Sequence, residues 1–328
     1  MRLIRRLRQP CLITVKALTL EILEDAKVGA HELLWINHID VLIYDVLLAE
    51  YVRVPYADDS LILIPCQFSS DLDWLYLSDI FATAWVGLDR AGFQPGDEVA
   101  IFGLGPLGLV CTYSAMLRGA SRVFGIDHVQ DRLDKAASLG ATPINFTSDE
   151  GTASEQILRR LPNGVARVVD CVGQASLDHR LKWVQNYAVQ ECIRVASVEG
   201  GITLLGGYGA VPKSDGVPNG DSAEEDLLVA VPLAFMKGLS ISMGSVGAHL
   251  YQTLPRLYEL VKSGRARFDF LAPAVMSIED APLGYERFDK KLEIKVVFRF
   301  PHSGHSGYET QQSDGSEIAS AAERTRFP

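Results

Sequence analysis

Two apolar runs separated by three spaced glycines constrain the fold of this chain more than any other feature of its sequence. The run 99–102 is short and wholly apolar, which predicts a strand buried on both faces of a parallel sheet. A helix is expected at about 107–117, and a second strand, 122–126, leads into Asp127. The glycines between the first strand and the helix are Gly103, Gly105 and Gly108. Strand, glycine turn, helix and strand in this order predict a βαβ unit.

The spacing Gly-x-Gly-x-x-Gly is typical of a binding site for the pyrophosphate of a dinucleotide. Gly103 permits a tight turn, Gly105 lets the backbone approach the phosphates without a Cβ atom, and Gly108 lets the helix pack closely on the strand. Pro106 and Leu107 stand at the start of the helix, whose unpaired N–H groups and positive dipole end attract an anion. We therefore predict that these five residues bind a dinucleotide cofactor.

Asp127 favours NAD over NADP as that cofactor. It lies 19 residues after Gly108, near the offset of about 20 at which an acid accepts hydrogen bonds from the adenosine ribose. A carboxylate at that place repels the 2′-phosphate of NADP. Arg132 is a further candidate for cofactor binding. A guanidinium near the ribose accommodates a phosphate, but beside Asp127 we expect it to stack on the adenine or to pair with the acid.

The alternation of strands and helices continues beyond this unit. Strands are expected at 143–146, 165–170, 201–206 and 239–243, and helices at 132–139 and 181–198. Together these elements predict an α/β fold with a doubly wound parallel sheet, the Rossmann arrangement. The nicotinamide half of the cofactor is expected at the loops that follow the strands, where Val172 is the candidate contact.

The flanks of this sheet predict a second, discontinuous domain. Strand-like runs at 49–55, 61–65, 271–278 and 294–300 lie on both sides of the nucleotide unit. We predict a partial catalytic domain of the GroES-like kind at 1–80, the NAD-binding domain at 81–270, a return of the reduced, β-rich catalytic domain at 271–301 and a disordered tail at 302–328.

Composition limits the partners of the chain. Its 328 residues are 48% hydrophobic and 22% charged, an ordinary balance for a globular protein, and the net charge of −10 disfavours nucleic acid and anionic membranes. No apolar run approaches the roughly 18 residues that a membrane helix needs. The five cysteines stand apart without a Cys-x-x-Cys pair, as reduced thiols do. We expect a cytoplasmic protein that acts on a small molecule.

Four segments together resemble the zinc-type alcohol dehydrogenases of the medium-chain dehydrogenase/reductase superfamily, and within it the formaldehyde dehydrogenase-like branch. They are 49–57, 77–85, the glycine pattern, and 280–291 with the Ile-Lys-Val-Val that follows. The resemblance implies a NAD-dependent oxidoreductase that interconverts an alcohol and an aldehyde or ketone with the help of a zinc ion. It also implies homo-oligomers that pair sheet edges near 239–243 and 272–276.

The zinc site that the resemblance implies is incomplete in this sequence. The family uses a cysteine in Cys-Gly-x-Asp, a histidine in Gly-His-Glu and a third ligand where this chain has Asp79. Catalytic zinc needs three protein ligands and one open position. His31, in Gly-Ala-His-Glu, and Cys11 are the other residues considered, although an isolated histidine is more often structural. Asp79 after Ser78 also suits the N-cap of a helix, and both interpretations stay open. Either the first 48 residues replace the family's segment, or the sequence is an imperfect gene product.

Two other functions stay open at this point. A zinc-free NAD(P)H reductase on the same scaffold would polarise its substrate with a side chain, and its candidate proton donors are Tyr76, Tyr208 and His249. A catalytically inactive NAD-binding protein would keep the glycine pattern without the metal. Asp170, at the end of an expected strand, is predicted to accept hydrogen bonds from loop amides.

Overall fold

A sheet of six parallel strands forms the centre of the computed structural model, which describes residues 13–15, 61–64, 71–244 and 249–299. The strand order is β5-β4-β3-β6-β7-β8. The strands are β3 (Glu98–Phe102), β4 (Arg122–Asp127), β5 (Thr142–Asn145), β6 (Val165–Asp170), β7 (Ala196–Leu204) and β8 (Ser240–Met243). All six strands are parallel. From β3 the chain adds β4 and β5 on one side and then β6, β7 and β8 on the other, so the predicted doubly wound parallel sheet is confirmed.

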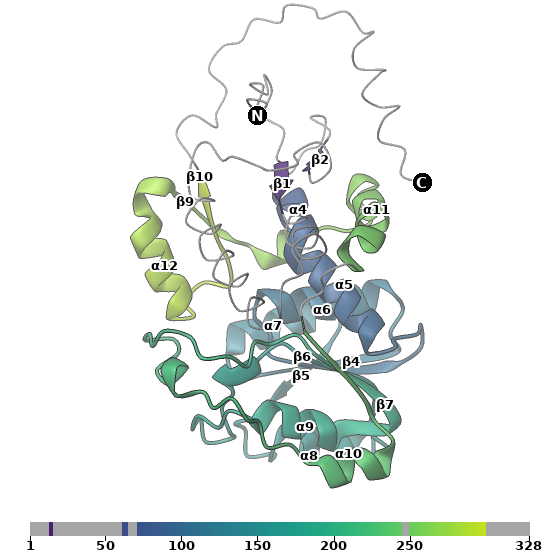
Figure 1. Cartoon of the computed structure of the whole chain (residues 1–328). Helices are drawn as coiled ribbons and strands as arrows, with labels where there is room; N and C mark the ends of the chain where they lie inside the picture. The colour runs from purple at the N-terminus through teal and green to yellow at the C-terminus, as the bar shows by residue number, and fades with distance from the viewer. Residues whose placement is uncertain (1–12, 16–60, 65–70, 245–248, 300–328) are drawn as a thin grey trace, which may run out of the picture.

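Helices cover both faces of this sheet (Figure 1). One face carries α5 (Ala82–Arg90), α6 (Pro106–Leu117) and α7 (Gln130–Ser138), and α11 (His249–Lys262) packs against α5. The other face carries α8 (Ala153–Arg160), α9 (Tyr187–Val195) and α10 (Val231–Lys237). None of the described helices has both the length and the apolar character needed to cross a bilayer.

Strand β3 lies in the middle of the sheet and is buried on both faces, as its apolar sequence predicts. Val99 and Ile101 pack in one hydrophobic cluster with Leu109 of α6, because alternate side chains of a strand point to opposite faces. Ala100 and Phe102 pack in the cluster on the other side. The glycine loop that follows β3 is therefore anchored in a strand that is buried on both faces.

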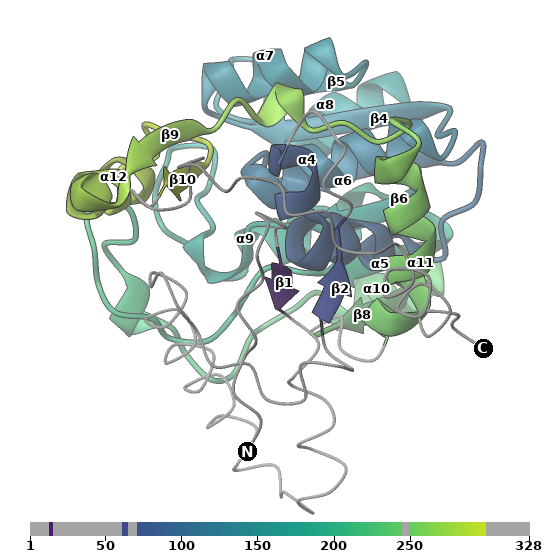
Figure 2. The ribbon, with the colours of Figure 1, turned by 90° about the horizontal axis from the view of Figure 1, so that it is seen from above.

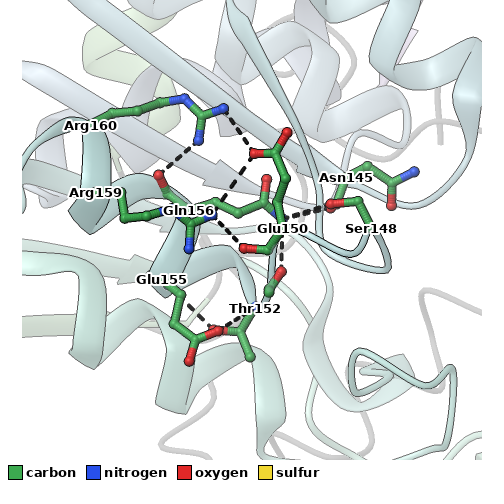
Figure 3. Close-up of polar contacts among 9 residues, drawn as sticks. Asn145, Ser148, Glu150, Thr152, Glu155, Gln156, Arg159 and Arg160 are labelled. Carbon is green, nitrogen blue, oxygen red and sulfur yellow. Dashed lines mark hydrogen bonds and ion pairs between the residues drawn. The ribbon is translucent and has the colours of Figure 1, made fainter.

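Side chains complete the start of α8 (Figure 3). Thr152 Oγ1 accepts a hydrogen bond from the Glu155 backbone N–H (3.3 Å), and Glu155 Oε2 accepts one from the Thr152 N–H (2.8 Å). This reciprocal pair satisfies two N–H groups that a helix start otherwise leaves free. Gln156 Nε2 donates to the backbone oxygens of Asn145 and Gly151, each at 2.8 Å, and so ties the end of β5 to α8.

The elements outside the sheet are shorter. Strands β9 (Ala274–Ser277) and β10 (Val296–Arg299) pair in parallel and form a lobe with α12 (Ala281–Asp289) at one side of the sheet (Figures 1 and 2). Strands β1 (Ile13–Val15) and β2 (Leu61–Leu63) pair antiparallel. The remaining elements are α4 (Asp71–Leu75), the π-helical η2 (Leu77–Phe81), and the 3-10 turns η3 (Gly173–Ala175), η4 (Gly220–Ser222), η5 (Asp269–Leu271) and η6 (Ile278–Asp280).

The second domain stays a prediction, as do the domain bounds 1–80, 81–270, 271–301 and 302–328. Of the strands expected for this domain, β2, β9 and β10 are present but shorter than expected. The strand expected at 49–55 and the tail at 302–328 lie outside the described residues.

The helix expected at 181–198 is wrong at both ends. Helix α9 covers only Tyr187–Val195, and β7 begins directly at Ala196, whose backbone is extended (φ −62°, ψ 139°). Lys237 Nζ donates to the backbone oxygens of Ile193 (3.1 Å) and Ala196 (2.6 Å), both at this helix end. A contact from α10 thus helps to end α9. Lys237 lies outside residues 181–198, so the hydrophobic pattern of that segment could not indicate this contact.

Candidate functional site

The loop between β3 and α6 has the geometry that the glycine pattern predicts for a phosphate site. Gly103 has a φ of 82°, in the left-handed region that favours glycine, and its N–H donates to the Ile126 oxygen at 2.9 Å. No described atom lies within 4 Å of a Cβ built on Gly105. Pro106 is the first residue of α6, and among the described residues no side chain caps this helix. The first N–H groups of α6 are therefore left for a ligand.

Gly108 marks the closest approach of α6 to the loop. A Cβ built on Gly108 lies only 1.7 Å from the backbone oxygen of Gly103. Because backbone cannot swing away as a side chain can, only glycine fits at this position. Gly105 is open toward the ligand side and Gly108 is closed by the loop, so the two glycines serve different purposes in one turn.

Asp127 ends β4 next to this loop, and three backbone N–H groups hold its carboxylate. Oδ2 accepts from Leu104 (2.8 Å), and Oδ1 accepts from His128 (2.7 Å) and Val129 (3.0 Å). The residue is 4% exposed, and Arg132 Nη1 lies 3.7 Å from Oδ2. A carboxylate has about four acceptor sites, so roughly one stays for a ribose hydroxyl. Asp127 therefore fits a ribose contact, but much of its charge is already engaged.

A second polar cluster lies where β6 and β7 end, at the edge expected for the nicotinamide half. Asp170 is fully buried, and its carboxylate accepts from Tyr208 Oη (2.7 Å), Val172 N–H (2.9 Å) and Gly173 N–H (3.3 Å). Burial raises the pKa of the Asp170 carboxyl above its usual value, while Tyr208 and the two N–H groups lower it. Burial and Asp170 also raise the pKa of Tyr208. Asp170 thus bonds loop amides, as predicted.

Val172 lies beside the glycine turn, because a Cβ built on Gly103 is 2.7 Å from Val172 Cγ2. The Gln174 N–H donates to the Gly207 oxygen at 2.8 Å, which joins the loop after β6 to the loop after β7. The structure therefore brings the candidate contacts for the two halves of a dinucleotide to one edge of the sheet. Their part in cofactor binding stays a prediction.

The cysteines of this region are thiols. Cys111 of α6 and Cys171 after β6 have their sulfurs 3.8 Å apart, and Cys111, Cys171 and Cys192 are free. The hydrogen bond with Cys111 and burial raise the pKa of the Cys171 thiol well above its usual value. The Cys171 sulfur is therefore a poor nucleophile at neutral pH.

The described residues do not assemble a zinc site. Asp79 lies inside η2, so the N-cap interpretation is wrong: the chain is already helical there, and the Phe81 N–H donates to the Tyr76 oxygen at 2.9 Å. Asp79 Oδ1 accepts from Thr83 Oγ1 at 3.3 Å. Within the described ranges, no group of three His, Cys, Asp or Glu side chains could hold a metal. Cys11 and His31 lie outside these ranges.

Two of the three candidate proton donors, Tyr76 and Tyr208, pack with different hydrophobic clusters. Tyr76 is buried, with 2% of its surface exposed. Burial and the negative charge of Asp73 raise the pKa of Tyr76 to about 12, so its hydroxyl is a weak acid. Tyr208 is engaged with Asp170 at the loop edge. His249 is the first residue of α11, and the structure does not describe its side chain.

Comparison with known proteins gives consistent matches. The family described as zinc-binding dehydrogenase matches residues 106–263. The glutathione-independent formaldehyde dehydrogenase of Bacillus subtilis (strain 168) is 36% identical over 261 residues, which cover 77% of this chain and 62% of that protein. The protein with the same description from Pseudomonas aeruginosa (strain LESB58) is 31% identical, with 78% and 65% covered.

Among solved structures, the alcohol dehydrogenase TADH from Thermus sp. ATN1 aligns with a TM-score of 0.62 at 27% identity, covering 77% of this chain and 66% of that one. The chain therefore spans less than two thirds of the length of the curated relatives named here. The family match begins at Pro106, the first residue of α6, and includes β4 to β8 of the central sheet.

Proposed function

Because this chain belongs to the zinc-type alcohol dehydrogenase family of the medium-chain dehydrogenases/reductases, we propose that it is a NAD-dependent oxidoreductase that interconverts an alcohol and an aldehyde or ketone. The formaldehyde and alcohol dehydrogenases among its relatives support this reaction class. The observation that carries the proposal is the β3–α6 loop, in which Gly105 is open toward a ligand and α6 begins without a side-chain cap. A small alcohol or carbonyl compound is the proposed substrate.

The residues of the loop have separate roles in this proposal. Gly103 and Gly108 set the close path of the backbone, and Gly105, Pro106 and Leu107 place the N–H groups of α6 against the pyrophosphate. The bound dinucleotide supplies the hydride acceptor or donor.

Asp127 and Val172 complete the proposed contacts at the two ends of the cofactor. Asp127 accepts a hydrogen bond from the adenosine ribose with the capacity that its three backbone donors leave. Val172 contacts the nicotinamide half, and the Asp170–Tyr208 hydrogen bond holds the loop that carries it.

Membership in the family is the only reason to expect a zinc ion in this protein. The family's chemistry uses the metal to polarise the substrate oxygen, which needs three protein ligands. Within the described residues the set does not fit, since Asp79 stands without two further candidate ligands around it. Asp79 is the proposed ligand, and residues outside the described ranges would have to supply the other two.

Three measurements on the full chain test the proposed function and its metal. Titration with NAD, followed by calorimetry, should give saturable binding with one site per chain. A panel of small alcohols with NAD should then produce absorbance of the reduced nicotinamide. Binding without turnover on any alcohol or aldehyde would favour a catalytically inactive NAD-binding protein. Absence of NAD binding would refute the proposal. Elemental analysis of the purified chain decides whether about one zinc per chain accompanies the activity.

We propose that a second copy of the chain pairs along β8. This strand is the last of the described sheet, and apolar side chains gather beside it: Phe235 is 83% exposed, Met236 78% and Met243 67%. Open strand edges and exposed apolar patches mark association surfaces. Light scattering after size exclusion should show a dimer or larger, and Phe235→Asp should shift it toward the monomer. A monomeric wild type would contradict this.

We also propose that the protein acts in the cytoplasm. The free thiols of Cys111, Cys171 and Cys192 support this, because disulfides are rare in reducing compartments. The sulfurs of Cys111 and Cys171 lie 3.8 Å apart and form no disulfide in the structure.

A further inference from the structure

Two thiols, those of Cys111 and Cys171, meet beside the glycine turn. Their sulfurs lie 3.8 Å apart, although 60 residues separate them in the sequence. Cys111 is fully buried on α6, and Cys171 is partly exposed directly after β6. Where a reducing compartment holds disulfides at all, they are usually transient and either catalytic or redox-sensing. A thiol pair of this kind therefore suits regulation rather than folding.

The sulfurs need only a small movement to form a bond. An S–S bond is about 2.0 Å long, so the two sulfur atoms must approach each other by about 1.8 Å. Rotation about χ1 supplies part of this movement, and the rest falls to the loop after β6, because α6 is fixed by its buried residues. Cys192, the other free thiol of the described residues, packs in the hydrophobic cluster on the opposite side of the sheet. Among these three described thiols, the fold thus pairs Cys111 with Cys171.

Cys171 packs directly against the turn that is proposed to bind the pyrophosphate. Its N–H donates to the Phe102 oxygen at 2.8 Å, and its backbone carbonyl carbon and oxygen lie 3.4 Å from a Cβ built on Gly103. The next residue, Val172, is the proposed contact for the nicotinamide half. Cys111 lies in α6, whose first N–H groups are the proposed phosphate contacts. A bond between the two sulfurs would therefore pull the loop after β6 toward α6 and displace proposed contacts of the cofactor.

We propose that Cys111 and Cys171 form a reversible disulfide when the protein meets hydrogen peroxide, and that this bond lowers the affinity for NAD. The effect on affinity rests on the proposed function, since it assumes that the dinucleotide lies at the β3–α6 loop. Reduction by a small thiol restores both sulfurs and the affinity. The pair is thus a redox switch on the cofactor loop.

The reaction takes two steps and uses one peroxide molecule. The more accessible thiol, Cys171, attacks one peroxide oxygen, the O–O bond breaks, the first water leaves, and a sulfenic acid forms. The Cys111 sulfur then attacks the Cys171 sulfur, the S–O bond breaks, the S–S bond forms, and the second water takes the Cys111 proton. The thiols lose two electrons, and the peroxide gains them. Since the pKa of Cys171 is raised, the first step is slow, and the switch responds to sustained oxidation.

Peptide mapping by mass spectrometry tests the bond on the full chain. After treatment with hydrogen peroxide, the peptides that contain Cys111 and Cys171 should be joined, with a mass about 2 Da below their sum, and dithiothreitol should separate them. Calorimetry should show that oxidation raises the Kd for NAD about 10-fold or more, the loss of one hydrogen bond to a charged group. Dithiothreitol should restore the Kd.

Substitution of each thiol separates the disulfide from other effects of peroxide. Oxidation should change the Kd for NAD of Cys111→Ala and of Cys171→Ala by less than about 2-fold, because neither can form the bond. Two variants are compared so that misfolding of one does not decide the result. Cys192→Ala is the matched control, because it removes a buried thiol on the other side of the sheet. It should form the bond and lose affinity as the wild type does.

The possible results distinguish the switch from the proposed function. Absence of the joined peptide, or oxidation of Cys171 to a sulfinic acid instead, would refute the switch. A joined chain that binds NAD as tightly as the reduced chain would refute it as well, while the proposed function stands. A reduced chain that binds no NAD would refute the proposed function, and with it the effect on affinity, whatever the peptide map shows.

Discussion

Gly108→Ala should destabilise the fold, whereas Gly105→Ala should spare the fold and weaken dinucleotide binding. The new Cβ at Gly108 would lie 1.7 Å from the Gly103 oxygen, well inside the 3.0 Å below which atoms must move. The atom in the way is backbone, so the β3–α6 turn itself must shift. Overpacking of this kind costs about 1–3 kcal/mol and occasionally more, and we expect about 3 kcal/mol here because no side chain can yield.

The Gly105 variant separates packing from ligand contact. A Cβ at Gly105 meets no described atom within 4 Å, and its φ of −64° suits alanine. Its unfolding free energy should therefore stay within about 0.5 kcal/mol of the wild type, because substitutions away from packed features have small effects. The same Cβ intrudes on the proposed pyrophosphate and should raise the Kd for NAD about 10- to 100-fold, the loss of one hydrogen bond to a charged group.

Urea unfolding followed by circular dichroism measures the first quantity, and calorimetric titration with NAD measures the second. If Gly108→Ala unfolds with the wild-type free energy, the close approach of α6 to the turn is wrong. If Gly105→Ala binds NAD as tightly as the wild type, the cofactor does not lie against this loop.

Three further substitutions test the polar contacts. Tyr208→Phe should lower the unfolding free energy by about 1–3 kcal/mol, because a buried carboxylate loses a 2.7 Å donor, and an unchanged urea midpoint would contradict that bond. Burial raises the folded-state pKa of Asp170 above 3.8, so the folded state holds this proton at pH values where the unfolded chain has released it. The difference in unfolding free energy between the wild type and Asp170→Asn should therefore fall as pH rises above 3.8, and it should level off once the folded-state carboxyl is ionised. Denaturant unfolding of both proteins at several pH values measures this difference. A difference that does not change with pH would refute the prediction. Thr152→Ala should cost about 1 kcal/mol by removing the N-cap of α8, while Thr152→Ser should keep most of it; equal losses in the two variants would show that the hydroxyl is not the cause.

The distribution of contacts explains why the cofactor half of the site is better defined than the metal half. The β3–α6 turn is built from consecutive residues that follow a buried central strand. The proposed metal ligand Asp79 lies in the π-helical segment η2, ahead of the sheet. Cys11 and His31, the other residues considered for the metal, lie outside the described ranges. Measurements of metal content and of turnover on the full chain therefore test the proposed chemistry at the substrate.

Local patterns predicted the central sheet because they depend on neighbouring residues. The apolar run before Gly103 forms β3, the glycines take the expected turn, and the strand expected at 165–170 is β6. The order of these elements was enough to predict the doubly wound sheet, which the structure confirms. Turn chemistry and periodicity act over a few residues, so the sequence alone expresses them.

Contacts between distant segments were decided only by the tertiary structure. Lys237 meets the end of α9, which shortened the helix expected at 181–198. Asp170 and Tyr208 were separate candidates in the sequence, and the parallel packing of β6 and β7 brought them to 2.7 Å. Lys291 lies far from Asp127 in the sequence, yet in the fold the charge of Asp127 acts on its ammonium. The sequence determined which elements form, because those signals are local; the packing of remote elements determined which side chains share one electrostatic environment.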